Sequence, residues 1–367
     1  MSYLSDIKFI KVDPTSLERH KLESLLDLYS EYIDFRDNPL PKFSTQYHEK
    51  WICTPKYGET DQLYYIAENL INGIVGLGIL KLNTGINNKD LAFMYFFVEK
   101  QYRRKGIAKN LLKLIYNDIP EVVTKITIYY RPKIFEGNKK LISENHQLKL
   151  FLIEKGGKKV FTERRSISNI KSFDIEETIK KAKELKEKVE KLGYEFIFVD
   201  GRVKEHPKLN FKEYVSMAER ISNDMPKEDG TWNDSIFSPE LYDSIQKHFL
   251  FLGHYVWTIV LIHTRSSLPI GLTQTWFHLE SPSLAFQSDT GVLNEHRGNG
   301  FGLALKFQML AKILKEKSTQ EVKYWQTSNA FSNIHMIKIN NELKHEEKIL
   351  FHEFEFQKEG VKNYLSK

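Results

Sequence analysis

The sequence predicts an α/β protein built from two similar domains, and three observations lead to this fold class. A strand that runs into a glycine-rich turn and then into a helix occurs twice, at residues 98–108 and 292–302. The strand-like and helix-like segments around the two copies follow nearly the same order. The length of 367 residues corresponds to two domains if a domain has roughly 100 to 200 residues.

The second glycine-rich turn is the most informative stretch of the chain. It lies between a predicted strand, Leu284–Leu293, and a predicted helix, Leu303–Leu314, and consists of Arg297, Gly298, Asn299, Gly300, Phe301 and Gly302. Such a turn directs unpaired backbone N–H groups and the positive end of a helix dipole toward one point. Glycine at positions 300 and 302 lets a phosphate group approach the backbone closely. We therefore predict a pyrophosphate-binding turn, to which Arg297 adds positive charge.

The first turn repeats this pattern at a constant offset. It follows Val98 and consists of Arg103, Arg104, Lys105, Gly106, Ile107 and Ala108; both 297 − 103 and 300 − 106 equal 194. Farther along, predicted strands at Val122–Tyr130 and Val322–Thr327 each precede a helical pattern that begins with an asparagine, Asn145 or Asn333. A long-range repeat with equal internal spacing indicates a duplicated domain.

Each domain is predicted to contain a strand, helices, three strands, the glycine turn with its helix, and then a strand, a helix and a last strand. The elements placed in the first domain are a strand Ile7–Val12, a helix near Ser16–Tyr32, and strands Leu63–Glu68, Gly73–Leu82 and Leu91–Val98. Those placed in the second domain are a strand Glu195–Val199, helices Phe211–Ile221 and Pro239–Phe249, and strands Tyr255–His263, Pro269–Phe277 and Leu284–Leu293.

A helix between the two repeats sets the predicted domain boundaries. Asp174 followed by Glu177 is typical of a capping box at a helix start, and Gly193 is typical of a helix end. We predict an N-terminal domain 1–173, a linker helix 174–193 and a C-terminal domain 194–367. Apolar residues recur every three or four positions along the helix, which fits either a connector that lies on one domain or a dimerising coiled coil.

Composition and charge limit the class of protein. Apolar residues make up 41% of the chain, enough to fill two cores, and no apolar run approaches the roughly 20 residues needed to span a bilayer. The N-terminus lacks a signal-peptide pattern, so we expect a cytoplasmic protein with no membrane partner. The 54 basic and 48 acidic residues are spread along the chain, and this pattern predicts no nucleic-acid partner.

Cysteine and histidine usage argues against metal and disulfide chemistry. Cys53 is the only cysteine, so the chain forms no internal disulfide and no cysteine-based zinc site. We expect Cys53 to be a buried small apolar residue rather than a nucleophile. The histidines show no metal-ligand spacing, and we predict no metal. The sequence is compatible with a monomer or a homodimer.

These motifs resemble those of the GNAT acyl-coenzyme A transferase superfamily, in which Arg/Gln-x-x-Gly-x-Gly/Ala lies between a strand and a helix and an Asn-led helix follows. Two such units in one chain resemble the tandem arrangement of mycothiol synthase and its relatives. The resemblance implies that each domain has a mixed, mostly antiparallel central sheet flanked by helices. It also implies acetyl-CoA as cosubstrate and transfer of the acyl group from the thioester to a primary amine, by direct attack in a ternary complex.

In that superfamily the strand before the glycine turn binds the pantetheine arm through its backbone. The resemblance assigns this role to Thr290, Gly291 and Val292, and it makes the Val292 N–H the donor to the thioester oxygen. In the first domain it assigns the role to Val98 and the two residues before it. Gly291 would ease a bulge, and the alternative is that it only bends a core strand.

The resemblance also places Asn329 and Asn333 beside the arm, although Asn333 is equally suited to capping its helix. Many members have a tyrosine seven residues after that asparagine, which protonates the departing thiolate. The corresponding residues here are Asn340 and Leu152, and neither is a phenol. The thiolate can take its proton from water instead, because a thiol pKa of about 8.5 makes it a tolerable leaving group.

Asp289 is the candidate general base. It lies three residues before Val292 on the strand expected to carry the acetyl group, where a carboxylate can accept the amine proton directly or through a water. The alternative role is a salt bridge or a turn hydrogen bond. Glu280 and His296 are weaker candidates.

The sequence thus predicts an N-acetyltransferase whose C-terminal domain is catalytic and whose acceptor is a small-molecule amine. Two alternatives stay open. The complete motif of the N-terminal domain is compatible with that domain being the active unit. The absence of both tyrosines is compatible with a non-catalytic CoA-binding scaffold protein. A small amine, an aminoglycoside-like compound, an aminoacyl group and a peptide N-terminus all fit as acceptors.

Overall fold

The computed structural model describes residues 4–37, 43–54, 56–131 and 152–366, and the chain packs as two compact units. Unit 1 comprises Met1–Thr162, Asp229–Asn233 and Phe351–Lys367; unit 2 comprises Glu163–Glu228 and Asp234–Leu350. Each unit has central strands flanked by helices and buried cores of its own. The predicted fold class is therefore confirmed.

The strands of unit 1 are mostly antiparallel. Their order is β1, β3, β4, β5, β6, β13, with β2 beside β3. Their bounds are β1 Ile7–Val12, β2 Lys56–Tyr57, β3 Thr60–Asn69, β4 Gly73–Asn83, β5 Leu91–Val98, β6 Lys125–Tyr130 and β13 Glu346–Gln357. The pair β5 and β6 is parallel, and the other pairs are antiparallel.

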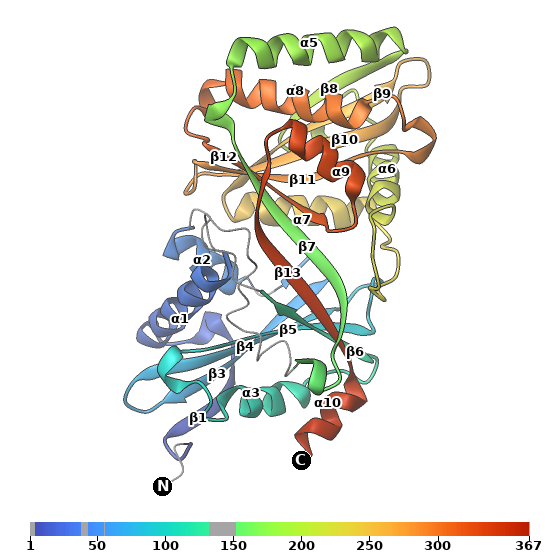
Figure 1. Cartoon of the computed structure of the whole chain (residues 1–367). Helices are drawn as coiled ribbons and strands as arrows, with labels where there is room; N and C mark the ends of the chain where they lie inside the picture. Colours follow the sequence, from blue (N-terminus) through green and yellow to red (C-terminus); the bar gives the residue numbers. More distant parts are fainter. Residues whose placement is uncertain (1–3, 38–42, 55, 132–151, 367) are drawn as a thin grey trace. The chain divides into compact units, whose positions relative to one another are not determined.

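Helices cover both faces of these strands (Figure 1). α1 (Arg19–Asp37) and α2 (Thr45–Ile52) pack on one core, and α3 (Ile107–Tyr116) and α10 (Lys358–Leu365) pack on the other. Tyr64 of β3 is buried in the first core and its neighbour Tyr65 in the second. Adjacent strand residues point to opposite faces, so this arrangement follows from the alternating side chains of β3.

Unit 2 repeats the plan. Its strands lie in the order β7, β12, β11, β10, β9, β8, and β11 pairs with β12 in parallel while the other pairs are antiparallel. The bounds are β7 Lys158–Asn169, β8 Tyr194–Asp200, β9 His254–His263, β10 Leu268–His278, β11 Leu284–Val292 and β12 Tyr324–Ala330. The helices are α5 Ile175–Lys191, α6 Phe211–Asn223, α7 Pro239–Phe251, α8 Phe301–Lys315 and α9 Ile334–Glu342.

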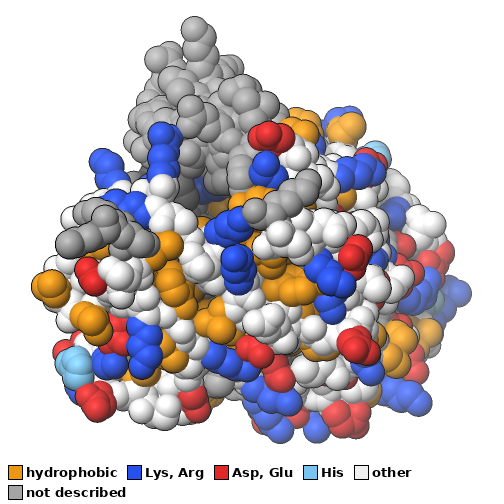
Figure 2. Space-filling model, turned by 90° about the horizontal axis from the view of Figure 1, so that it is seen from below, with side chains coloured by type: hydrophobic (Ala, Val, Ile, Leu, Met, Phe, Trp, Pro, Cys, Tyr) orange, Lys and Arg blue, Asp and Glu red, His pale blue; other side chains and the backbone are white. Residues whose placement is uncertain are grey.

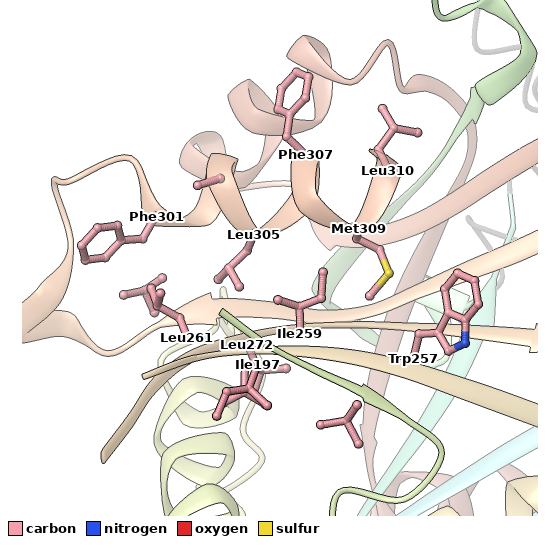
Figure 3. Close-up of a cluster of buried hydrophobic side chains, with 14 of the residues drawn as sticks. Ile197, Trp257, Ile259, Leu261, Leu272, Phe301, Leu305, Phe307, Met309 and Leu310 are labelled. Atoms are coloured by element: carbon pink, nitrogen blue, oxygen red, sulfur yellow. The ribbon is translucent and has the colours of Figure 1, made fainter. Parts of the chain in front are cut away.

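The main core of unit 2 forms between its strands and α8. Figure 3 shows Phe301, Leu305 and Met309 of α8 above the strands that carry Ile259 and Leu261. α6 lies on the opposite face. A Cβ added to Gly291 would meet Ile221 of that helix, whereas one added to Gly271 would approach Leu305 of α8.

The units differ in extent from the predicted division into 1–173, 174–193 and 194–367. Residues Glu163–Asn169 of β7 pair with β12 inside unit 2, and residues His352–Gln357 of β13 pair with β6 inside unit 1. Each unit therefore ends in a strand taken from the other half of the sequence. Periodicity identifies a strand but not its partner, and these exchanges could not be read from the chain.

The predicted linker helix is α5, and it belongs to unit 2. Asp174 accepts a hydrogen bond from the Glu177 N–H at 2.8 Å, and Gly193 has a φ of +86°, as the start and stop signals indicate. Gln308 of α8 donates to the Ala182 carbonyl at 2.5 Å. The apolar stripe of α5 thus lies on α8.

Charged side chains of both signs are interspersed on the face seen in Figure 2, in line with the near balance of 54 basic and 48 acidic residues. Among the residues that the structure describes, no helix combines the length and the apolar character needed to cross a membrane.

Candidate active site

The parallel strands of each unit separate after a short paired segment. In unit 2, Leu284–Gln287 pair with Tyr324–Thr327, and beyond these residues β11 and β12 are not paired with each other. In unit 1, Leu91–Met94 pair with Lys125–Ile128 and then β5 and β6 separate. We call residues 288–292 and 328–330 the splay of unit 2. A splay leaves strand backbone without a ladder partner, and an extended ligand with amide groups can pair there.

The backbone of β11 presents hydrogen-bonding groups to the splay. The Leu293 N–H donates to the Ile270 carbonyl of β10 at 2.9 Å. Antiparallel ladders alternate, so the N–H and C=O groups of Val292 and Thr290 point away from β10 and into the splay. The Val292 carbonyl accepts from Nε of Arg297 at 2.9 Å. The Val292 N–H is therefore directed as a thioester-oxygen donor would have to be.

A β-bulge lies at the narrow end of this splay, which is the end next to the last parallel pair, Gln287 and Thr327. Thr290 is opposite Thr273 and Gln287 is opposite Thr275, so two residues, Ser288 and Asp289, share one partner, Gln274. The orphaned Gln274 carbonyl accepts a hydrogen bond from Nε2 of Gln287 at 2.7 Å. The Gln287 side chain thus provides a hydrogen-bond donor for the carbonyl that the bulge leaves without a partner on β11.

Gly291 lies next to this bulge but not in it. It pairs in regular register with Leu272, and a Cβ at this position would lie 2.2 Å from Cγ2 of Ile221. Glycine is needed at 291 because α6 packs closely against the strand.

Both glycine turns lead into helices without a side-chain cap. Gly300 and Gly106 are the N-caps of α8 and α3, with φ of +75° and +83°, and neither helix has a side-chain hydrogen bond at its cap. The first helical bond of α8 runs from Ala304 to the Gly300 carbonyl at 3.1 Å. The N–H groups of residues 301–303 consequently have no acceptor within the helix, which is the arrangement that binds an anion.

The side chains of the second turn have structural partners. Arg297 also donates to the Asp224 carboxylate at 2.7 Å, and Asn299 donates to the His296 carbonyl at 3.2 Å. Phe301 is buried against Tyr194, with ring centroids 4.8 Å apart. The groups of the turn that these contacts leave available to an anion are therefore its backbone N–H groups, and the charge of Arg297 is largely compensated by Asp224.

Three glycines in this turn have different physical roles. Gly298 and Gly300 have positive φ, and a Cβ at either position would meet no atom within 4 Å, so their conformation is the reason for glycine. A Cβ at Gly302 would approach Cδ1 of Ile339 to 3.2 Å. Gly302 thus permits the packing of α9 on α8.

The first turn is built in the same way with other side chains. Nε of Arg103 donates to the Val98 carbonyl at 2.8 Å, which repeats the Arg297 contact. Arg104 has a φ of +62° where unit 2 has Gly298. Lys105 lies over the Tyr102 ring at 5.2 Å. Ile107 is buried in the core of unit 1, and Ala108 follows it in α3.

Asp289 is one of the two residues of the bulge. It retains solvent-exposed surface, yet the protein atoms packed around it raise the pKa of its carboxyl above the ordinary value. Within the described residues its carboxylate makes no ion pair and no hydrogen bond, so the alternative role of a salt bridge or turn bond finds no support there.

Two tyrosines that the sequence reading missed face this carboxylate. The hydroxyls of Tyr214 on α6 and Tyr242 on α7 are 3.0 Å apart, and Tyr242 also hydrogen-bonds with the Gln274 side chain. Burial, together with the charge of Asp289, raises the pKa of Tyr242 to about 12. Both tyrosines lie in the apolar stripe of an amphipathic helix, so the sequence alone indicates a packing role and gives no sign of a polar one.

The predicted asparagines have distinct positions. Oδ1 of Asn333 accepts from the Met336 N–H at 3.2 Å, so this residue caps α9. Asn329 lies in the splay, on β12 two residues beyond the last parallel pair. Asn145 falls outside the described residues. Nδ1 of His296 is hydrogen-bonded to the Tyr194 hydroxyl at 2.9 Å. Among the hydrogen bonds of the described residues, His296 has none with Asp289.

Comparison with known proteins agrees with this architecture. Residues 22–128 match the model of the acetyltransferase (GNAT) family, and this match includes the first glycine turn. A comparison with curated proteins gave no significant match.

Several solved structures share the fold of the whole chain. A tandem GNAT protein from the clavulanic acid biosynthesis pathway is similar over 96% of this chain and 98% of its own, with a TM-score of 0.70 and 15% identity. A GCN5-related N-acetyltransferase from Sphaerobacter thermophilus is similar over 96% of both chains, with a TM-score of 0.62 and 11% identity. These likenesses establish a tandem GNAT fold.

The family match and the fold together define the class of the protein. It is an acyltransferase, with a GNAT acetyltransferase domain in residues 22–128 and a second unit of the same plan. Members of this family use acetyl-CoA as cosubstrate, and the uncapped glycine turns and splayed strands of the two units fit that molecule.

Proposed function

We propose that the protein is an acetyl-CoA-dependent N-acetyltransferase and that unit 2 carries the reaction. One observation supports this assignment above the others. Unit 2 combines a splay, a bulge and the unpaired carboxylate Asp289 at the narrow end of the splay. In unit 1 the strand register between β4 and β5 is regular, and no bulge occurs.

The binding mode follows from the backbone groups of unit 2. The diphosphate binds to the N–H groups at the start of α8, and the amide-bearing arm pairs with the outward N–H and C=O groups of Thr290 and Val292. The phosphate end is fixed at the turn, so the arm runs back along β11 and brings the thioester to the narrow end of the splay, beside Asp289.

The chemistry needs one proton acceptor. Asp289 takes a proton from the amine, whose nitrogen then attacks the thioester carbon. The new C–N bond forms, the C–S bond breaks, and its electron pair leaves on sulfur as a thiolate. The nitrogen loses its second proton as it becomes an amide, and the thiolate takes up this proton through water. A raised pKa makes the Asp289 carboxylate a stronger base. Direct transfer is favoured over a covalent acyl-enzyme because Cys53, the only cysteine, belongs to unit 1 and burial raises the pKa of its thiol.

The acceptor is proposed to be a small-molecule amine. A carboxylate with two tyrosine side chains near it suits a cationic, hydrogen-bonding acceptor. The cytoplasmic location, the absence of nucleic-acid and membrane partners, the monomeric or dimeric state and the likeness to the mycothiol synthase group stay predictions of the sequence.

One rival proposal makes unit 1 the active unit, and the family match to residues 22–128 favours it. At the position of Asp289, however, unit 1 has Tyr95, which stacks on Tyr129 of the neighbouring strand with ring centroids 5.4 Å apart. A stacked aromatic pair offers no proton acceptor. A second rival, the non-catalytic CoA-binding scaffold, predicts binding without thiol release.

Substitution of one glycine in each turn tests these proposals. Gly300→Val and Gly106→Val each place a branched side chain at a positive φ and block the backbone N–H groups of one unit. Calorimetry with acetyl-CoA and thiol release with a panel of amines are measured for both variants. We expect Gly300→Val to abolish turnover and Gly106→Val to leave it within about threefold. The opposite result assigns catalysis to unit 1, and binding without thiol release from any amine supports the scaffold.

A further inference from the structure

A buried lysine ends a chain of side-chain amides that leads to the splay of unit 2. Nζ of Lys306 on α8 donates to Oδ1 of Asn340 on α9 at 2.6 Å. Nδ2 of Asn340 in turn donates to Oδ1 of Asn329 at 2.6 Å. Lys306 and Asn340 are buried, whereas Asn329 is half-buried and lies where β11 and β12 have separated.

The lysine fixes the direction of every hydrogen bond in this chain. In its protonated form, which predominates below about pH 7, Lys306 only donates, so Asn340 turns its oxygen toward Lys306 and its nitrogen toward Asn329. Asn329 then accepts with its oxygen, and its own Nδ2 is left as the donor at the end of the chain. Without the lysine, both amides could rotate by 180°, and Asn329 could present an acceptor instead.

Unit 1 shows that the fold does not need this chain. The offset of 194 places Leu112 at the position of Lys306. The parallel registers place Tyr130 at the position of Asn329, and Leu152 corresponds to Asn340. Leu112, Tyr130 and Leu152 pack in one apolar core. Three apolar residues in one unit thus take the place of three hydrogen-bonded polar residues in the other.

The lysine is also costly to bury. Within the described residues it makes no ion pair, and burial lowers the pKa of its ammonium to about 7. The titratable group that faces it is His345, whose pKa is lowered to about 3 by burial and by the charge of Lys306. His345 is therefore neutral and cannot compensate the charge. The partners of the ammonium are the Trp325 ring, whose centroid is 5.9 Å from Nζ, and the Asn340 amide, and neither carries a negative charge. A buried cation without an anionic partner at this position calls for a functional reason.

We propose that Lys306 is a positioning residue that makes Asn329 an N–H donor to the thioester carbonyl oxygen of an acyl-CoA bound in the splay of unit 2. This inference rests on the proposed function. The arm runs from the glycine turn toward the narrow end of the splay, and Asn329 is two residues from that end. When the amine attacks, the carbonyl electron pair moves onto oxygen, and the Nδ2–H of Asn329 and the Val292 N–H stabilise the resulting oxyanion. The electron pair returns as the C–S bond breaks.

Three variants test the role of the chain. Lys306→Met removes the cation at similar length, Asn329→Asp replaces the donor with an acceptor, and Leu112→Met is the matched control at the equivalent position of unit 1. Steady-state kinetics are measured together with the infrared carbonyl frequency of bound acetyl-CoA carrying a ¹³C-labelled acetyl group. Because a hydrogen bond lowers this frequency, the measurement reports the donor itself and not the stability of the unit.

We expect Asn329→Asp to lower kcat by about 10²-fold, in the range found for loss of one oxyanion donor. Lys306→Met should lower kcat by about tenfold while the KM for the amine changes less than twofold. Both variants should raise the carbonyl frequency toward its value in solution, and Leu112→Met should change neither quantity. If Lys306→Met does not fold, the double variant Lys306→Leu with Asn340→Leu, which copies unit 1, is measured in its place.

Two results overturn the inference, and they differ from failure of the proposed function. If acetyl-CoA binds and turns over but neither substitution changes kcat or the carbonyl frequency, Lys306 and Asn329 have no role in the reaction and the proposed function stands. If wild-type protein shows no binding of acetyl-CoA by calorimetry at millimolar concentration, the proposed function fails and this inference fails with it.

Discussion

The two units of this chain share the same backbone arrangement around the glycine turn, but they differ in the side chains near it. Each has parallel strands that separate, an arginine that ties the strand end to the turn, and a glycine with positive φ at the start of a helix. These shared features leave backbone N–H groups without a side-chain cap at the start of α3 and α8. They are what a duplicated fold retains when the side chains around it change.

The difference lies at the narrow end of the splay. From the last parallel pair to the strand end, unit 1 has the four residues 95–98 and unit 2 has the five residues 288–292. This one extra residue produces the bulge, places Asp289 in it and leaves the Gln274 carbonyl to accept a hydrogen bond from Gln287. A single insertion thus accounts for several of the polar features of unit 2. Under the proposed function, the features common to both units bind the coenzyme, and the extra residue of unit 2 and its neighbours serve proton transfer.

The largest expected effect concerns the proposed base. Asp289→Asn should lower kcat by about 10²- to 10⁴-fold while the Kd for acetyl-CoA is unchanged. In wild-type protein kcat should fall as the pH decreases through the raised pKa of Asp289, because protonation removes the acceptor. Steady-state kinetics against pH and calorimetry measure both. Tyr95→Phe in unit 1 is the control, and an equal loss of kcat in the control would abolish the contrast between the units.

The second expected effect is a pH-dependent gain in stability on replacing Lys306 with Met. The folded-state pKa of Lys306 is about 7 against 10.5 in the reference state, so the unfolded chain binds more protons between these values. The penalty of the buried charge is complete below pH 7 and disappears as the pH rises to 10.5. Lys306→Met should therefore stabilise unit 2 most at pH 6, with an advantage that shrinks by about 1.4 kcal/mol per pH unit above 7. Urea unfolding at several pH values measures this slope, and a constant difference across pH would contradict it.

The third expected effect sharpens the role of the bulge. Gln287→Met introduces the side chain that unit 1 has at the equivalent position, Met94, and removes the donor to the Gln274 carbonyl. A buried carbonyl without a partner costs about 1–3 kcal/mol, so the free energy of unfolding should fall by this amount. Ser288→Ala, at the exposed residue of the same bulge, should change it by less than about 0.5 kcal/mol. Equal losses in the two variants would show that Gln287 has no special part.

The smallest expected effect lies in the glycine turns. Arg104 has a φ of +62° where unit 2 has Gly298, and an L-residue in that region is strained by about 1–2 kcal/mol. Arg104→Gly should stabilise unit 1 by about 1 kcal/mol, because part of the gain is offset by the added flexibility of the unfolded chain. Gly298→Arg in unit 2 should have the opposite sign. Denaturant unfolding measures both, and a loss of stability in Arg104→Gly would mean that contacts of the arginine outweigh its strain.

Local features of the fold could be predicted from the sequence. The bounds Ile7–Val12 and Leu91–Val98 are those of β1 and β5, and Asp174 caps its helix as predicted. Asn333 has the capping role that the sequence offered as the alternative to coenzyme contact. These features depend on residues close in sequence, where periodicity and capping are legible. The last strand of each unit depends on pairing over long distances, and α2 (Thr45–Ile52), a helix of only eight residues, was not predicted.

The sequence predicted the backbone features of the candidate site but not most of its polar side chains. The glycines and the strand before them could be found because positive φ and strand-to-helix turns restrict residue type. The bulge could not be predicted, because the offset of 194 residues was measured only at the two glycine turns. That offset does not reveal one additional residue earlier in the strand. Lys306, Tyr214 and Tyr242 were hidden because each lies in an otherwise apolar helix stripe, and their meaning comes from partners on other elements.

The interleaved segments of the units have a consequence for how the protein is made. Residues 351–367 complete unit 1, so residues 163–350 must be synthesised before β13 can pair with β6. Until then β6 has an unsatisfied edge that can recruit other strands. Nascent chains should therefore need chaperone protection for longer than those of a protein whose two domains are each continuous in sequence. If the N-terminal and C-terminal parts of the chain are expressed separately, each should lack one strand of its sheet.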